Sequence, residues 1–349
     1  MPVASNQRSL DTLRGFACLL LVVYHVIGSD PANGLRIADG PVRVLNDGLA
    51  YLRMPLFTFL AGMVYGLHPF AGDSRAFLAG KTRRLLVPML FVGTAFALAQ
   101  SFLPETNFGA TQGAKREWLL LHLEPVGHFW FVEALFSIFV LVWALERARI
   151  LSTPGRFAVV WLLAALLDLT VHGPRWVALD GAIFLLPYFL GGLAASRFSL
   201  MPRLAHPWTR TLLIAAAALA ILQLGLPVPN PDRHSPWILL AGVSLCALCV
   251  GIRVEVAWLA RIGASSYAIY LFHVFFTAAS RMALAKAGLT ILPLQIVAGV
   301  ACGIAAPMLV EHWAARISAA RLLLLGQGFR GTRPRASPAT ARTAAGTLG

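Results

Sequence analysis

Two ionisable residues fall in the first apolar stretch of this sequence, where a charged or polar side chain is costly unless it has a partner or a function. Arg14 and His25 are eleven residues apart, or three helical turns, so on a helix they share one face about 16 Å apart. A histidine there suits general acid/base chemistry, because imidazole exchanges a proton near neutral pH. Two simpler interpretations stay open: Arg14 orients the helix or pairs with Asp11, and His25 is an ordinary packed polar group.

A cationic cluster lies just before another apolar run. Lys81, Arg83 and Arg84 place three cations within four residues. Arg and Lys bind phosphate groups well, so the cluster is a candidate anion site. Positive charge is also usual at the cytoplasmic end of membrane helices, and that interpretation stays open.

A third candidate group opens the apolar run from 128 to 146. His128 and Trp130 begin it, and Glu133 follows one turn later. A lone acid at that depth should face the bundle interior, where it has a partner or carries a proton. The alternative is a structural role, in which a basic or hydroxyl group hydrogen-bonds to Glu133 from another helix.

A polar stripe marks a late apolar run. Ser266, Tyr270 and His273 are spaced i, i+4 and i+7, which puts them on one face of a helix. Such a face must lie against other helices or a wet cavity. It forms either the wall of an active site or a hydrogen-bonding contact between helices.

The elements that carry these residues are apolar runs of membrane-spanning length. Hydrophobic residues make up 58% of the 349-residue chain and charged residues only 13%, which excludes an ordinary soluble protein. The runs recur near the length that crosses a bilayer, so we predict an all-α polytopic membrane protein of about ten transmembrane helices. The predicted spans are 9–28, 47–67, 85–103, 128–146, 156–172, 180–196, 210–226, 236–252, 262–282 and 290–313.

The positive charge sets the orientation of these spans. The net charge is +14, but the basic residues sit in short connections between apolar runs, so nucleic-acid binding is not predicted. With the N-terminus in the cytoplasm, 20 of the 29 Lys and Arg residues lie on the inner side and 9 on the outer side. Both termini are therefore predicted to be cytoplasmic. Residues 1–325 form the transmembrane domain, and the basic, Gly- and Pro-rich tail 326–349 is predicted to be disordered.

The first half of the chain resembles acyltransferase family 3. Arg14 and His25 match the family's signature of an arginine, ten intervening residues and a histidine, and the segment Met54–Gly62 is similar to its Pro-Leu-Phe segment. Lys81-x-x-Arg84 stands where the family usually has Arg-x-x-Arg. Lysine at the first position keeps the charge but lacks the two-pronged grip of arginine on a phosphate.

The second half carries the resemblance further. The run from His128 through Trp130 is similar to the family's His-Leu-Trp-Phe, with Phe in place of Leu, and Ser266–His273 matches its late helix. The segment Leu186–Gly191 also fits. The motifs occur in the family's order over residues 8–313, so the whole membrane part resembles the family.

The resemblance implies transfer of an acyl group from cytoplasmic acyl-coenzyme A to a hydroxyl of a sugar or glycan in the bacterial envelope, by a multi-pass protein of the inner membrane. Acetyl is the expected group and succinyl the alternative. In this interpretation Lys81, Arg83 and Arg84 hold the coenzyme's phosphates, and Arg14 lies at the same mouth. His25 acts as the general base or forms a transient acyl intermediate, and Arg14, His128 and Glu133 complete the catalytic set.

The remaining candidates, Asp11, Trp130, Ser266, Tyr270 and His273, are expected to line the substrate cavity. No tightly bound cofactor and no metal site are predicted; the partners are the acyl donor, a glycan acceptor and the lipid bilayer. Two other functions stay open. A proton-coupled transporter or polysaccharide flippase would use the same intramembrane groups as a proton relay, and an assembly partner would be non-catalytic.

The predicted orientation is tested by labelling introduced cysteines with a thiol reagent that does not cross the membrane. We expect Ala79→Cys to be protected from outside, because its loop is predicted to be cytoplasmic, and Ala110→Cys to react. The opposite pattern would place the cationic cluster on the outer side and remove the argument for a cytoplasmic donor.

Overall fold

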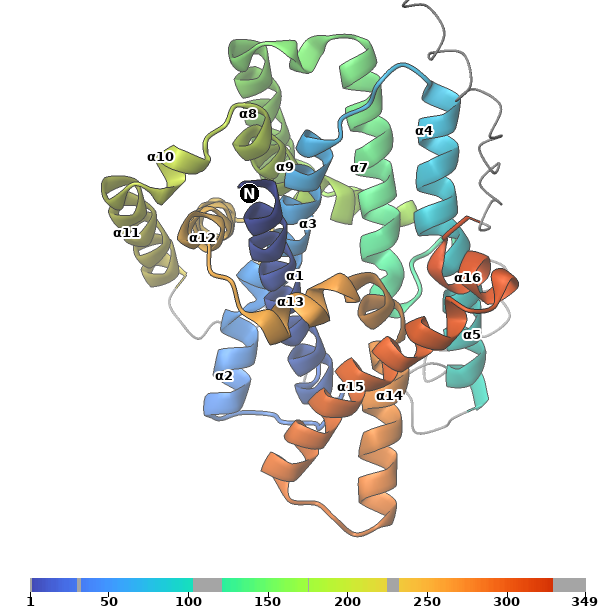
Figure 1. Cartoon of the computed structure of the whole chain (residues 1–349). Coiled ribbons are helices and arrows are strands. Elements are labelled where there is room, and N and C mark those ends of the chain that lie inside the picture. Colours follow the sequence, from blue (N-terminus) through green and yellow to red (C-terminus); the bar gives the residue numbers. More distant parts are fainter. Residues whose placement is uncertain (1, 30–32, 103–120, 175, 225–231, 329–349) are drawn as a thin grey trace, which may run out of the picture.

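The computed structural model describes residues 2–29, 33–102, 121–174, 176–224 and 232–328, with side chains from Gln7 onward. These residues form helices and, apart from an isolated bridge between Leu121 and Glu124, no β structure (Figure 1). The helices are α1 (Pro2–Ile27), α2 (Pro41–Gly48), α3 (Ala50–Leu67), α4 (Ser74–Lys81), α5 (Val87–Phe102), α7 (Trp130–Arg147), α8 (Pro154–Thr170), α9 (Leu179–Arg197), α10 (Met201–Ala205), α11 (Pro207–Gln223), α12 (Pro236–Ile252), α13 (Ala257–Ala264), α14 (Ser266–Lys286), α15 (Leu292–Ala314) and α16 (Ser318–Leu325).

The all-α polytopic membrane fold predicted from the sequence is confirmed. Within the described residues, 7 helical segments are long and apolar enough to cross a membrane, and α11 and α12 are shorter apolar helices. Each of the ten predicted spans overlaps a helix, while the count of ten crossings and the cytoplasmic termini stay predictions. Ala110 and the tail beyond Gly328 lie outside the described residues.

Apolar side chains cover the outside of the molecule as well as its core. Large exposed hydrophobic residues gather on α8, α11 and α15, as at Leu162, Leu212, Leu222, Val297 and Leu309. A soluble protein rarely exposes so much contiguous apolar surface, whereas lipid tails cover it at little cost. These helices therefore form the lipid-facing perimeter, and α1, α3, α7, α9 and α14 form the interior.

Helices α3 and α9 touch backbone to backbone. A Cβ added at Gly62 would lie 2.0 Å from the carbonyl oxygen of Phe189, and one at Gly192 would lie 1.8 Å from that of Phe59. No side chain larger than hydrogen fits at either position. Small residues at helix contacts are the usual means of close packing in membranes, where lipid is as apolar as the protein.

A second glycine pair joins α1 to α13. A Cβ at Gly15 would lie 1.9 Å from the carbonyl oxygen of Leu259, and one at Gly263 would lie 1.8 Å from that of Asp11. Helix α13 thus lies directly against the part of α1 that carries Arg14, and Figure 1 shows the two helices next to each other.

We predict that Gly192→Ala destabilises the protein. The added methyl group overlaps a backbone atom that cannot rotate away, and overpacking of this kind costs about 1–3 kcal/mol. The matched control is Gly80→Ala in α4, where no atom lies within 4 Å of the new Cβ. In thermal melts of the purified protein in detergent, Gly192→Ala should melt below wild type and Gly80→Ala at or above it. Equal melting of all three would show that the contact between α3 and α9 is not tight.

Candidate active site

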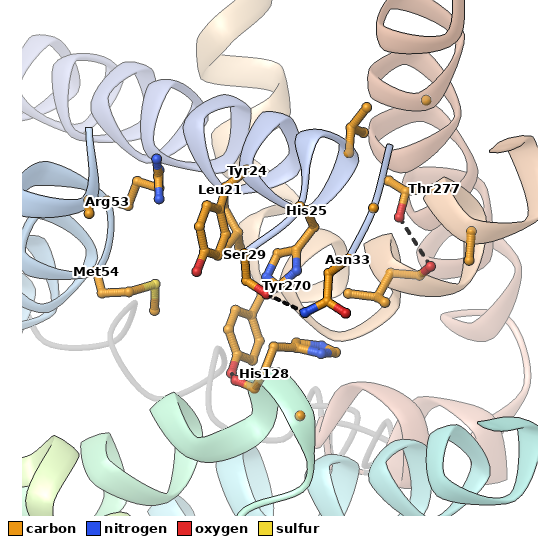
Figure 2. A pocket seen from close by; sticks show the side chains of 18 of the residues that line it. Leu21, Tyr24, His25, Ser29, Asn33, Arg53, Met54, His128, Tyr270 and Thr277 are labelled. Carbon is orange, nitrogen blue, oxygen red and sulfur yellow. Dashed lines mark hydrogen bonds between the residues drawn. The ribbon is translucent and has the colours of Figure 1, made fainter. Parts of the chain in front are cut away.

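A cavity of about 610 Å³ lies inside the bundle, between α1, α3, α7 and α14. That volume is in the range of small-molecule binding pockets. Figure 2 shows side chains from separate helices converging on it. Its walls include Tyr24, His25, Arg53, His128, Trp130 and Tyr270.

Three histidines from three helical segments meet at one wall of this cavity. The ring centroids of His25 and His273 are 4.8 Å apart, those of His128 and His273 are 5.0 Å apart, and those of His25 and His128 are 5.8 Å apart. His25 and His128 line the cavity, and His273 lies behind them, fully buried. Each of the three histidines belongs to a different motif of the sequence, and the fold brings them into one cluster.

Backbone carbonyls fix the tautomer of His273. Its Nδ1 lies 2.9 Å from the carbonyl oxygens of both Ile269 and Tyr270, so Nδ1 carries a proton and donates it. In the neutral ring the lone pair is then on Nε2, which has no hydrogen-bond partner among the described residues. The hydroxyl of Tyr270 donates to the carbonyl oxygen of His128, which ties α14 to the start of α7.

His25 sits in the last turn of α1, and α2 holds that turn in place. The helix ends at Ile27. The next residue, Gly28, has a φ of 114°, which other residues rarely adopt, and its amide donates to the carbonyl of Tyr24 at 2.8 Å. Arg43 and Asn46 on α2 donate to the carbonyl oxygen of Gly28 at 3.1 and 3.2 Å. These bonds satisfy a helix end inside the protein and thereby set the depth of His25.

Arg53 is a cavity residue that the sequence analysis missed. It is 4% exposed on α3, its guanidinium carbon lies 4.1 Å from the centroid of the Tyr24 ring, and it donates to Asn46 at 3.3 Å. The sequence did carry a signal for Arg53. A lone arginine inside the apolar run 47–67 is costly to bury in a membrane, just as Glu133 is in the run 128–146, and such a residue is a functional candidate. Arg233 and Arg281, from other parts of the chain, also line the cavity.

Several predicted site residues lie away from this cavity. Arg14 and Asp11 form an ion pair at 2.9 Å toward the other end of α1. Glu133 is buried, and neither of its carboxylate oxygens has a hydrogen-bond partner among the described residues. Ser266 opens α14, where its carbonyl lies 3.9 Å from the sulfur of Cys18. None of these side chains lines the cavity.

The predicted cationic cluster is divided. Arg83 and Arg84 line a second cavity of about 510 Å³ together with Tyr267, Arg321 and Gln327. Both arginines belong to a π-helical turn, Thr82–Leu86, a geometry that recurs at functional sites.

Lys81, by contrast, points into an aromatic cage. Its Nζ is 3.4 Å from the centroid of the Phe139 ring, 5.4 Å from that of Phe77 and 6.0 Å from that of Tyr65. It does not line the second cavity. Contact with aromatic faces compensates a buried ammonium group in part, so this position is stabilising without any bound anion.

Helix α14 connects the two cavities. Tyr267 lines the second and Tyr270 the first, one helical turn apart, or about 4.5 Å along the axis. The hydroxyl of Tyr267 donates to the carbonyl of Leu85 at 3.2 Å, so the side chain is held against the π-helical turn.

Comparison with known proteins gives one match. A family model of acyltransferase family 3, described as an acyltransferase domain, matches residues 7–312. No curated protein and no solved structure matches the chain. The matched range takes in both cavities except for the residues after 312 that border the second.

Proposed function

This chain belongs to that acyltransferase family, and we propose that it moves an acyl group from acyl-coenzyme A to a hydroxyl of an envelope or exported glycan in the bacterial inner membrane. The observation that carries the proposal is the cluster of His25, His128 and His273 on the wall of a cavity large enough for a sugar. Acetyl is the expected group.

In the proposed reaction His25 is the general base. Its neutral ring nitrogen takes the proton of the acceptor hydroxyl as the oxygen bonds to the acyl carbon. The bond between that carbon and the sulfur of coenzyme A then breaks, and the imidazolium returns its proton to the thiolate. The products are the ester and the free thiol, so protons and electron pairs balance.

We assign His273 a positioning role toward this base. Nδ1 of His273 donates to backbone carbonyls, so its Nε2 is left as a hydrogen-bond acceptor. The neighbouring imidazole rings are those of His25 and His128. An acceptor at Nε2 of His273 favours the tautomer of His25 that carries its proton on the facing nitrogen. The orienting carboxylate of a catalytic triad acts on its histidine in the same way.

The composition of the cavity wall supports a polar, ring-shaped acceptor. Trp130 brings an aromatic ring to the wall, and the apolar face of a sugar packs well on such a ring. The Tyr24 ring is stacked by Arg53. Asn33, Gln100 and Arg281 add amide and guanidinium groups to the wall, although Asn33 and Arg281 already donate to Ser29 and Gly34. Such a mixture of apolar wall and a few directed polar groups is typical of small-molecule sites.

The second cavity supports an acyl-coenzyme A donor. Arg83, Arg84 and Arg321 place three guanidinium groups around it, and arginine binds phosphates through paired hydrogen bonds. A coenzyme held there would have its thioester near Tyr267, one helical turn of α14 from the first cavity. Lys81 has no part in this grip, because it lies among aromatic rings.

The donor assignment predicts that Arg84→Gln and Arg321→Gln raise the KM for acyl-coenzyme A. Loss of one charged hydrogen bond costs about 1.5–3 kcal/mol, which corresponds to roughly a 10- to 100-fold rise. Lys81→Met should leave KM unchanged while lowering the melting temperature, since it removes only the cation–π contact. Steady-state kinetics by thiol release distinguishes the cases. A normal KM in both arginine variants would remove the donor from this cavity.

The catalytic assignment predicts that His25→Gln loses transfer, because general-base catalysis contributes about 10²–10⁴-fold. Glutamine keeps a hydrogen-bonding group of similar size, so a packing role would survive it. The control is His206→Gln, at an exposed position that lines neither cavity. Thiol release and glycan mass are measured on proteins of equal melting temperature. If His25→Gln keeps more than about a tenth of wild-type transfer, the role of base passes to another residue.

A further inference from the structure

A second group of ionisable side chains lies outside the proposed reaction. His172 follows α8, Asp180 is in the first turn of α9, and His234 precedes α12. Their candidate ligand atoms all lie within 4.8 Å of one another. We propose that His172, Asp180 and His234 bind a divalent transition-metal ion of the zinc class, although the sequence alone predicted no metal.

The spacing of two of these atoms fits tetrahedral coordination. Nε2 of His234 is 3.4 Å from Oδ1 of Asp180. In a tetrahedral zinc site with bonds of 2.0–2.1 Å, two ligand atoms are about 3.3–3.4 Å apart. The distance between these two atoms therefore already matches that of two ligands of one ion. His172, whose ring centroid is 4.8 Å from that of His234, would supply the third ligand.

A carboxylate behind His234 directs its lone pair toward the cluster. Nδ1 of His234 is 2.8 Å from Oδ1 of the fully buried Asp168 and 2.9 Å from that residue's carbonyl oxygen, so Nδ1 carries the proton. Nε2 then holds the lone pair, and it has no hydrogen-bond partner among the described residues although His234 is only 6% exposed. A carboxylate, a histidine and a metal in this order form the usual outer support of zinc ligands.

Asp180 is also held in place. Its Oδ1 accepts a hydrogen bond from the backbone amide of Gly173 at 3.0 Å, and its other oxygen pairs with Arg233. His172 is exposed, which leaves an entry path and a fourth position for water. Two imidazole ligands favour zinc or a related transition metal over calcium or magnesium, which prefer oxygen.

The proposed ion would lie beside the acceptor cavity. Arg233 lines that cavity and packs over its wall, with its guanidinium carbon 5.9 Å from the centroid of the Trp130 ring. The three proposed ligands come from the end of α8, the start of α9 and the segment before α12, so the ion would hold these segments together. Asp180 also pairs with Arg233, which links the ion to the cavity rim. The metal site does not depend on acyl transfer.

The test measures metal on the full chain, purified in detergent with a tag that contains no histidine. After chelator treatment, wild type should take up one Zn²⁺ per chain and melt at a higher temperature with the ion than without it, and Co²⁺ should give the visible absorption of tetrahedral coordination. His172→Ala and Asp180→Asn should lose tight binding. Asp168→Asn should weaken it roughly 10- to 100-fold, as outer-shell changes do.

The control is His206→Ala, which removes an exposed histidine elsewhere and should bind Zn²⁺ as wild type does. Because His172 is exposed, its replacement tests the site without disturbing buried groups. If wild type binds no more Zn²⁺ than His172→Ala, or if His206→Ala loses as much, the proposal is wrong. The cluster would then be a polar network in which His234 lies between Asp168 and Asp180.

Discussion

The contact of α3 with α9 and that of α1 with α13 are made backbone to backbone, and the cavity depends on both. In a bilayer, lipid offers no hydrophobic gain for bringing helices together, so close van der Waals contact has to hold them. Gly62 and Gly192 allow it in one pair, and Gly15 and Gly263 in the other. Helix α1 carries His25 and α3 carries Arg53. Each of these two helices is therefore held against a neighbour by a contact that admits no side chain.

The polar groups in this interior follow a second constraint, which is that each backbone group has to be satisfied inside the protein. The end of α1 shows how this is done, since Arg43 and Asn46 on α2 bind the carbonyl of Gly28 that a helix end leaves open. Among the described residues, the Nε2 atoms of His128, His234 and His273 have no such hydrogen-bond partner. All three histidines lie in a proposed reaction or metal site, where an open coordination or hydrogen-bonding position is what the chemistry needs.

Much of the fold followed from composition, and much of the site did not. Apolar runs and their breaks located the helices, because length and hydrophobicity decide what spans a bilayer. The separation of Lys81 from Arg84 was not predictable, since a π-helical turn winds more residues into each turn than an α-helix and rotates the two apart. Likewise, His172 and His234 are far apart in the sequence and belong to no common motif. Only the packing of α8, α9 and α12 brings them together.

The position of Tyr267 and Tyr270 has a consequence for the membrane that surrounds the protein. Tyr267 lines the second cavity and Tyr270 the first, three residues apart near the start of α14, so only a short length of this helix separates the two linings here. Both hydroxyls are bound to backbone carbonyls, one on Leu85 and one on His128, so neither ring turns aside without losing a buried hydrogen bond. In the proposed reaction the acyl group has to pass this pair to reach the acceptor, so transfer requires at least one of these hydrogen bonds to break. At other times the pair would limit leakage of water and protons between the two cavities.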